Sequence, residues 1–152
     1  MKPAPDNFPR LSSGVVYQDA AKAIDWLCEA FGFELRLKVE GEPGQILHSE
    51  LTYGEGVIMV SPEKQAAPNH PWQSGMRSPK SLGGMSTQSI MMYVDDVDAH
   101  CAQARAKGAV IVEEPSTHDY GDEYWSDRSY GAMDLEGHVW WISQRVRSSG
   151  TK

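Results

Sequence analysis

The chain has 152 residues, of which 40% are hydrophobic and 23% are charged, and its formal net charge is −7. That length fits one globular domain or two very small ones. The negative charge argues against a nucleic-acid partner, which needs a basic face to displace counterions. No stretch approaches the roughly 18 consecutive apolar residues of a membrane span. We therefore expect no nucleic-acid partner and no membrane partner.

Residues 1–10 contain three prolines and no apolar segment, which predicts an extended lead-in rather than a secretory signal. Two cysteines, Cys28 and Cys101, each fall on the apolar side of a helical pattern. We expect them to be buried free thiols, with a disulfide as the alternative. The default compartment is then the cytoplasm.

The first apolar run, at residues 15–19, predicts a short strand that ends in Asp19. A helix follows, because apolar residues then recur with helical spacing. Asp19 is placed to cap its first turn, and Gly32 can adopt the left-handed conformation that ends it. The helical stripe consists of Ile24, Leu27, Cys28 and Phe31. The next predicted strands are residues 33–39, 45–52 and 57–61, separated by glycine-containing turns at 41–44 and 53–56.

The second half of the chain repeats this order. The run 91–96 ends in Asp96, which stands 77 positions after Asp19. A second helical stripe follows, and Gly108 is its predicted stop. The stripe consists of Val97, His100, Cys101 and Ala104. Three strands are predicted after it, at residues 109–113, 126–133 and 138–144.

Each half is thus a strand, a helix and three strands, which predicts the α+β class with two βαβββ modules. A single domain over residues 1–152 would contain the first module at 11–61 and the second at 89–144. Curled mixed sheets would then surround a shared cavity, the natural place for a ligand. Residues 62–88 are too long for an ordinary connection and are interpreted as a linker between modules or as a lid. Trp72 lies in this segment.

Several motifs resemble the vicinal-oxygen-chelate superfamily, which contains glyoxalase I, extradiol dioxygenases and bleomycin-resistance proteins. They are Tyr17-Gln18-Asp19-Ala20-Ala21, Ile24-Asp25-Trp26-Leu27, Ala30-Phe31-Gly32-Phe33 and the closing turn Asp134-Leu135-Glu136-Gly137 with the strand His138-Val139-Trp140-Trp141-Ile142. Leu135 stands where the family usually has proline. The resemblance covers residues 11–144 and implies the family fold and, often, a homodimer. It says little about chemistry, since one fold hosts unrelated activities.

The resemblance also implies where metal ligands would lie. The metal enzymes of the family take ligands from the first and last strands of each half, and those positions here are Ser12, Met59, Ser89 and Trp141. Two neutral hydroxyls, a thioether and an indole without a free lone pair cannot replace His, Glu or Gln. We therefore expect no metal and no other cofactor.

One pair of side chains could still perform acid/base chemistry. His48 and Glu50 lie two residues apart, and strand alternation places both on the face opposite Leu47 and Leu51. If the leucines pack under the helix, a carboxylate beside the imidazole would form an acid/base pair facing the cavity. The alternative is a polar pair at a solvated edge. A metal pair would need a further ligand from His118, Asp119 or His138.

The segment 117–128 is rich in polar and aromatic residues, among them Trp125 and Arg128. Beside a cavity, such a loop could stack on a flat ligand, and its acidic residues would favour a cationic one. The alternative is a solvated acidic loop. Arg128 could anchor a ligand carboxylate or pair with a neighbouring acid. The acidic residues are Asp119, Asp122, Glu123 and Asp127.

Trp140 and Trp141 must point to opposite faces of the last strand. Matching with the family makes Trp141 the inward residue, and Met59, Met91 and Tyr93 would line the same space. Such an aromatic and thioether wall suits a planar hydrophobic ligand, although these side chains could equally fill a core.

The sequence therefore predicts a metal-free member of the family that binds a small organic molecule, aromatic or cationic, as drug-sequestering proteins do. The alternative is a metal-independent or unusually liganded lyase, isomerase or dioxygenase-like enzyme that uses His48 and Glu50. The predicted ligand-binding residues are Met59, Trp72, Met91, Tyr93, Trp125, Arg128 and Trp141.

Overall fold

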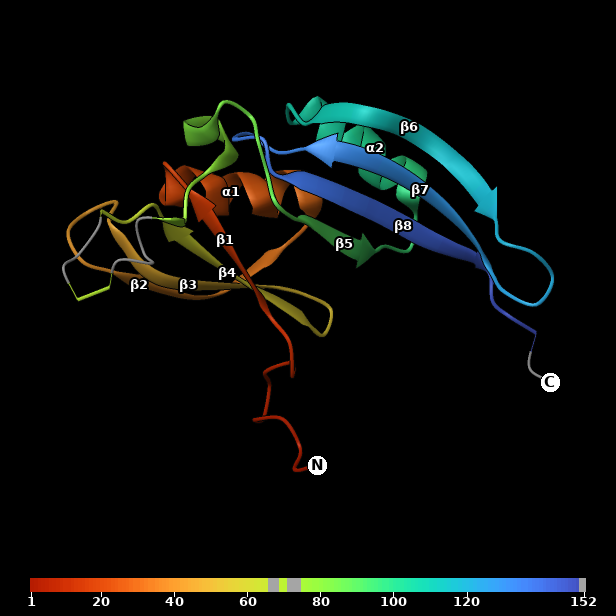
Figure 1. The fold of residues 1–152 in the computed structure, drawn as a ribbon, viewed down its shortest axis with the longest axis horizontal. Coiled ribbons are helices and arrows are strands. Elements are labelled where there is room, and N and C mark those ends of the chain that lie inside the picture. The colour runs from red at the N-terminus through yellow and green to blue at the C-terminus, as the bar shows by residue number, and fades with distance from the viewer. Residues whose placement is uncertain (66–68, 71–74, 151–152) are drawn as a thin grey trace. The chain divides into compact units, whose positions relative to one another are not determined.

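The structure is a computed structural model that describes residues 1–65, 69–70 and 75–150. It contains two compact units, Met1–Gly83 and Gly84–Lys152 (Figure 1). The first unit contains β1 (Ser13–Tyr17), α1 (Ala20–Phe31), β2 (Glu34–Glu40), β3 (Ile46–Tyr53), β4 (Gly56–Pro62) and the short 3-10 helix η2 (Pro79–Leu82). The second contains β5 (Ser89–Tyr93), α2 (Val97–Ala106), β6 (Val110–Asp119), β7 (Ser126–Met133) and β8 (Val139–Arg147).

Helix α1 begins and ends where its capping residues predict. The carboxylate of Asp19 accepts a hydrogen bond from the backbone N–H of Lys22 at 3.0 Å, which satisfies one of the unpaired donors of the first turn. Gly32 ends the helix in the left-handed region, with φ of 78°, where a side chain would be strained. The apolar stripe is buried against the sheet, with Ile24 and Leu27 almost fully inaccessible.

The sheet of the first unit has the strand order β1-β4-β3-β2, with β1 and β4 parallel and the other neighbours antiparallel. Leu51 packs under α1 as predicted, but Leu47 is 53% exposed, so its expected packing is wrong. A register shift in the β2–β3 ladder leaves Leu47 unpaired and turns Ile46 into the core instead. An extra residue in one strand of a ladder reverses the alternation, so the residues beyond it turn the opposite side chains toward the core.

The second unit repeats the same topology, with strand order β5-β8-β7-β6 and one parallel pair, β5 with β8. Helix α2 is capped by Asp96, which accepts from the backbone of Ala99. Strand β6 extends to Asp119, well beyond the predicted residues 109–113. Half of the predicted loop 117–128 is therefore paired strand, because β6 and β7 form a long hairpin with its turn at residues 120–125.

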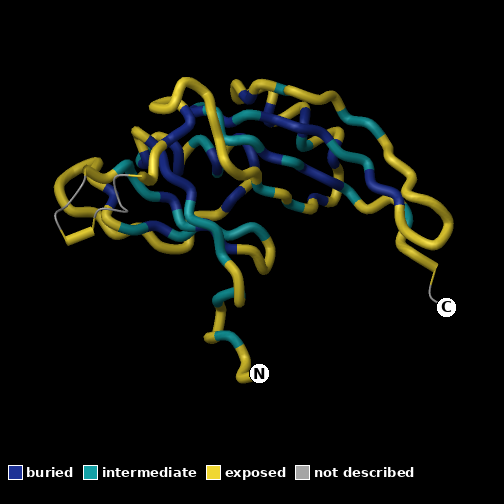
Figure 2. The backbone as a smooth tube through the Cα atoms, viewed as in Figure 1, coloured by how far each residue is buried: buried dark blue, intermediate teal, exposed yellow. Residues whose placement is uncertain are grey.

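The core of the second unit is organised by Trp140, which is fully buried beneath α2. Its indole N–H donates to Asp134 at 3.0 Å, and the same carboxylate accepts from the backbone of Glu136 and His138. The closing turn 134–137 is thus fixed by a buried, satisfied acid. Figure 2 shows the central strands β7 and β8 of the second unit as more buried than its edge strands, and β2 of the first unit as exposed along its length.

Both cysteines are free, with Cys101 buried and Cys28 half-buried. Burial raises the pKa of each thiol, because desolvation disfavours the thiolate. The expectation of free thiols packed as small apolar groups holds for both, although Cys28 is less enclosed than predicted.

The described residues of segment 62–88 up to Gly83 belong to the first unit. Glu63 accepts from the backbone N–H of Ser78 at 2.8 Å, and Gln18 donates to Ser81 at 2.7 Å. These contacts hold η2 against the end of β1. Trp72 lies outside the described residues.

The α+β class and the two βαβββ modules with mixed sheets are confirmed. Within the described part of the chain, no helix is long and apolar enough to cross a membrane.

Candidate functional site

The second sheet has two unlike faces. Helix α2 packs against β6, β7 and β8, and we call the opposite side of this sheet the second open face. Alternation along β8 buries Trp140 and Ile142 beneath α2 and places Trp141 on the second open face. Met91 of β5 is the register partner of Trp141 and is 55% exposed. The structure thus brings together two of the predicted ligand-binding residues.

The indole of Trp141 lies over β7 because the strand has a glycine there. A Cβ added at Gly131 would stand only 2.8 Å from Cζ3 of Trp141 and 3.0 Å from Cγ2 of Val112. Real Cβ contacts are not so short, so any side chain at this position would displace the indole. Gly131 therefore shapes the second open face, and sequence reasoning did not single it out.

Tyr93 extends this face toward Arg145. The Arg145 guanidinium donates through Nε to Asp127 at 2.6 Å and through Nη2 to the Tyr93 hydroxyl at 2.6 Å. The Tyr93 hydroxyl in turn donates to Asp127 at 3.0 Å. The guanidinium also lies 5.2 Å from the ring centroid of Tyr93 and 5.1 Å from that of Trp125, both within cation–π distance. We call these four residues the Arg145 cluster.

The carboxylate of Asp127 is the buried member of the Arg145 cluster. Asp127 is only 4% exposed, and its hydrogen bond to Arg145 raises the pKa of that guanidinium further above its ordinary value. Sequence reasoning missed Arg145 and assigned Asp127 to an acidic loop. Alternation along β8 could have identified Arg145, since residues 141, 143 and 145 lie on the same face of the strand.

The hairpin turn between β6 and β7 adds exposed aromatic rings beside this cluster. Tyr120 and Tyr124 stand 5.8 Å and 6.2 Å from the ring of Trp125. The acid Asp119 is paired with Arg147 at 2.5 Å, just as Asp127 is paired with Arg145. Two of the four acids expected to attract a cation are therefore neutralised by arginines, which weakens the electrostatic argument for a cationic ligand.

Arg128 does not join this group. Alternation along β7 turns it toward α2, where Nε and Nη2 each donate to the Asp98 carboxylate at 2.8 Å. This bidentate pair lowers the pKa of Asp98 through its hydrogen bonds to Arg128. Of the two roles considered for Arg128, the structure supports pairing with a neighbouring acid.

The first unit brings His48 and Glu50 together on the face of its sheet opposite Leu51. Nε2 of His48 lies 3.1 Å from Oε1 of Glu50, and Arg36 of β2 donates to the other carboxylate oxygen at 2.9 Å and 2.5 Å. The hydrogen bonds from His48 and Arg36 hold the pKa of Glu50 below its ordinary value. Glu50 is therefore ionised near neutral pH and can orient the imidazole.

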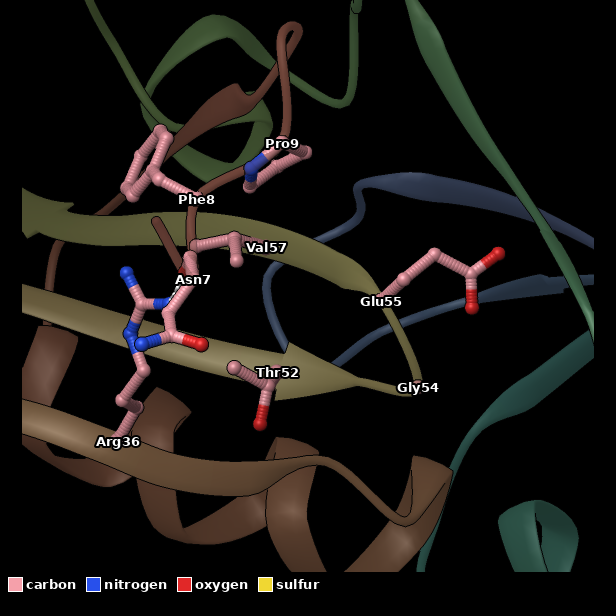
Figure 3. A pocket seen from close by; sticks show the side chains of 8 residues that line it. All are labelled: Asn7, Phe8, Pro9, Arg36, Thr52, Gly54, Glu55 and Val57. Carbon is pink, nitrogen blue, oxygen red and sulfur yellow. Dashed lines mark hydrogen bonds between the residues drawn. The ribbon is translucent and has the colours of Figure 1, made fainter. Parts of the chain in front are cut away.

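A pocket of about 500 Å³ in the same unit is lined by Arg36, the hydrogen-bond partner of Glu50, but not by His48 or Glu50. Figure 3 shows residues of the N-terminal segment over β4, with the side chain of Arg36 pointing toward Asn7. Arg36 donates to the backbone carbonyl of Asn7 and lies 5.2 Å from the ring of Phe8. The lining residues are Asn7, Phe8, Pro9, Arg36, Thr52, Gly54, Glu55 and Val57.

The four positions that correspond to the family's metal ligands do not fit a divalent ion. The hydroxyl of Ser12 donates to the carbonyl of Val57 at 2.8 Å, Met59 offers only a thioether, and the Trp141 indole is held against Gly131. The fourth position is Ser89, a neutral hydroxyl. Among the described residues there is no group of three or more His, Cys, Asp or Glu side chains that could hold a metal ion.

Comparison with known proteins identifies the family. The model of the Glyoxalase/Bleomycin resistance protein/Dioxygenase superfamily matches residues 11–142, and the chain belongs to this superfamily. It is similar to the uncharacterized protein Mb0911c of Mycobacterium bovis, with 33% identity over 141 residues that cover 91% of this chain and 85% of that protein.

Solved structures agree with this assignment. TioX from Micromonospora sp. ML1 is 30% identical, with a TM-score of 0.64 over 91% of this chain and 99% of that chain. A member of the same superfamily from Sphaerobacter thermophilus DSM 20745 is 16% identical, with a TM-score of 0.64 over 88% of this chain and 94% of that chain. The second likeness shows the fold alone. The family and the fold predicted from the sequence are confirmed.

Proposed function

We propose that this protein binds a planar aromatic molecule on the second open face, without a metal, and so holds or sequesters it. The observation that carries the proposal is the exposed Met91 beside the Trp141 indole, whose position depends on Gly131. Met91 and Trp141 form an accessible apolar surface, and contact with a flat apolar ligand would remove that surface from water. The ligand-binding roles predicted for Met59 and Trp72 stay predictions and form no part of this proposal.

The chemistry of these side chains supports a flat apolar ligand. Aromatic rings stack with about 0.5–1.5 kcal/mol beyond the area that they bury, and a methionine adapts its three rotatable bonds to the ligand's outline. The Tyr93 and Trp125 rings continue the same surface. The paired acids Asp119 and Asp127 leave less reason to expect a cation than the sequence suggested.

Titration of the full chain with 2-naphthamide, a neutral planar probe, tests this proposal by isothermal calorimetry. We expect saturable binding that Trp141→Ala weakens at least tenfold. Trp26→Ala is the control, because Trp26 belongs to α1 in the other unit and packs on Phe31. Unchanged affinity in Trp141→Ala, with native circular dichroism, would remove the second open face from consideration.

A second candidate function is acid/base catalysis by His48 and Glu50. The 3.1 Å contact between Nε2 and the carboxylate favours it, because Glu50 can hold the Nε2 proton and leave Nδ1 as the acceptor. Once a bound compound is identified, the test is its turnover by His48→Ala and Glu50→Gln. Loss of turnover with retained affinity supports catalysis, whereas loss of affinity alone assigns the pair to binding.

We also propose a homodimer, as the family resemblance implies, and the cytoplasm as its location, the default compartment for a chain with free thiols. Light scattering after size exclusion would measure twice the mass of 16.8 kDa. A mass of one chain at micromolar concentration would contradict the dimer.

A further inference from the structure

We infer that the ligand of the second open face carries a carboxylate, which Arg145 binds while the aromatic body rests on Met91 and Trp141. This inference depends on the binding function proposed above and names the class of ligand, an aromatic carboxylic acid. It replaces the expectation of a cationic ligand, which rested on four acids, two of which the structure shows to be paired with arginines.

The first argument is the hydrogen-bonding capacity left on Arg145. A guanidinium has five N–H donors, and Arg145 uses Nε for Asp127 and Nη2 for Tyr93. Nη1 takes part in no hydrogen bond or ion pair with any described residue, and the side chain is 37% exposed. At least two donors on one edge of the guanidinium therefore remain for a ligand.

The second argument is that the guanidinium is already held in place. Asp127 and the Tyr93 hydroxyl fix it in position, and the rings of Tyr93 and Trp125 both lie within cation–π distance of it. A ligand would therefore not have to immobilise a flexible arginine, which otherwise costs binding free energy. A planar carboxylate matches the fork of guanidinium donors and binds it through charge-assisted hydrogen bonds.

The third argument is spacing. Met91 and Tyr93 are two residues apart on β5, which is about 6.6 Å along a strand, and the guanidinium lies beside the Tyr93 ring. A fused two-ring aromatic body over Met91 would thus bring a carboxylate on its edge to Arg145. Asp127 opposes an anion, but it occupies the Nε side of the guanidinium and leaves the Nη1 side open.

The test compares three probes of one shape by calorimetry on the full chain: 2-naphthoate, neutral 2-naphthamide and cationic 2-naphthylmethylamine. We expect 2-naphthoate to bind at least tenfold more tightly than 2-naphthamide, and the amine to bind most weakly. The advantage of the acid should fall as salt concentration rises, since the contact is partly exposed.

Variants assign that advantage to one residue. Arg145→Gln should equalise the affinities of acid and amide. The double variant Arg145→Gln/Asp127→Asn should do the same without leaving a buried carboxylate unpaired, which protects the test if the single variant unfolds. Arg128→Gln is the matched control, because it breaks an arginine–aspartate pair on the α2 side of the same sheet and should retain the preference.

The outcomes separate the two proposals. Equal binding of acid and amide to the unaltered protein, or tightest binding of the amine, overturns the carboxylate inference and leaves the aromatic site standing. A preference for the acid that survives in the double variant also overturns the role of Arg145. Binding of none of the three probes overturns both.

Discussion

The two modules share a topology but differ in the side chains on the open faces of their sheets. In the first unit, the side opposite α1 has Arg36, Glu50 and His48 in one hydrogen-bonded group beside a pocket. In the second unit, the corresponding side has Met91 and Trp141 beside the Arg145 cluster. The repeated module thus has the same helix, caps and strand order in both units, whereas the side chains on the exposed face of the sheet differ.

The largest effect should come from comparing the two faces of β8. Trp140→Ala removes a fully buried indole and should destabilise the protein by about 3–5 kcal/mol. Trp141→Ala, on the second open face, should cost less than about half of that. Urea denaturation followed by circular dichroism measures both. Equal losses would mean that Trp141 is a core residue rather than part of a binding surface.

The next largest effect should come from comparing a glycine substitution in each unit. Gly131→Ala places a Cβ against Trp141 and Val112 and should cost about 1–3 kcal/mol through overpacking, while also weakening 2-naphthamide binding. Gly14→Ala in β1 is the matched control, because a Cβ there meets nothing within 4 Å. Similar unfolding free energies for the two variants would contradict the close approach of the indole to β7.

Smaller effects should show what the modules have in common. Asp19→Ala and Asp96→Ala each remove a carboxylate that accepts a backbone N–H at 3.0 Å in the first turn of a helix. Each should lower the unfolding free energy by about 1 kcal/mol, with little change in probe binding. A loss of probe affinity in Asp96→Ala but not in Asp19→Ala would indicate that α2 itself contributes to the site.

The smallest effect concerns pH and the group around Glu50. Its folded-state pKa is lowered by hydrogen bonds from His48 and Arg36, so its contribution to stability is present above the ordinary value of 4.5 and is lost as the pH falls through the folded-state value. Urea denaturation should therefore show Glu50→Gln less stable than the unaltered protein at pH 7, with the difference shrinking in acid. A difference that grows in acid would reverse the sign of the shift.

Much of the fold could be predicted from local signals. Asp19 and Gly32 mark the ends of α1 because caps depend on backbone groups within one turn, and the alternation of Trp140 with Trp141 follows from strand geometry. The bulge at Leu47 and the extension of β6 to Asp119 could not be predicted, since both depend on how one strand pairs with another. Tyr93 and Trp125 were each predicted as ligand-binding residues, but the arginine that lies against both rings was not.

The sequence by itself determined the family, the repeated module and the absence of suitable metal donors at the family's ligand positions, because these follow from residue order and side-chain chemistry. Only the tertiary structure decided which charges meet. It paired Asp127 with Arg145 across β7 and β8, paired Arg128 with Asp98 of α2, and laid Trp141 over Gly131. Such contacts join residues that are distant in the chain, and strand register, which local patterns do not encode, sets which of them become neighbours.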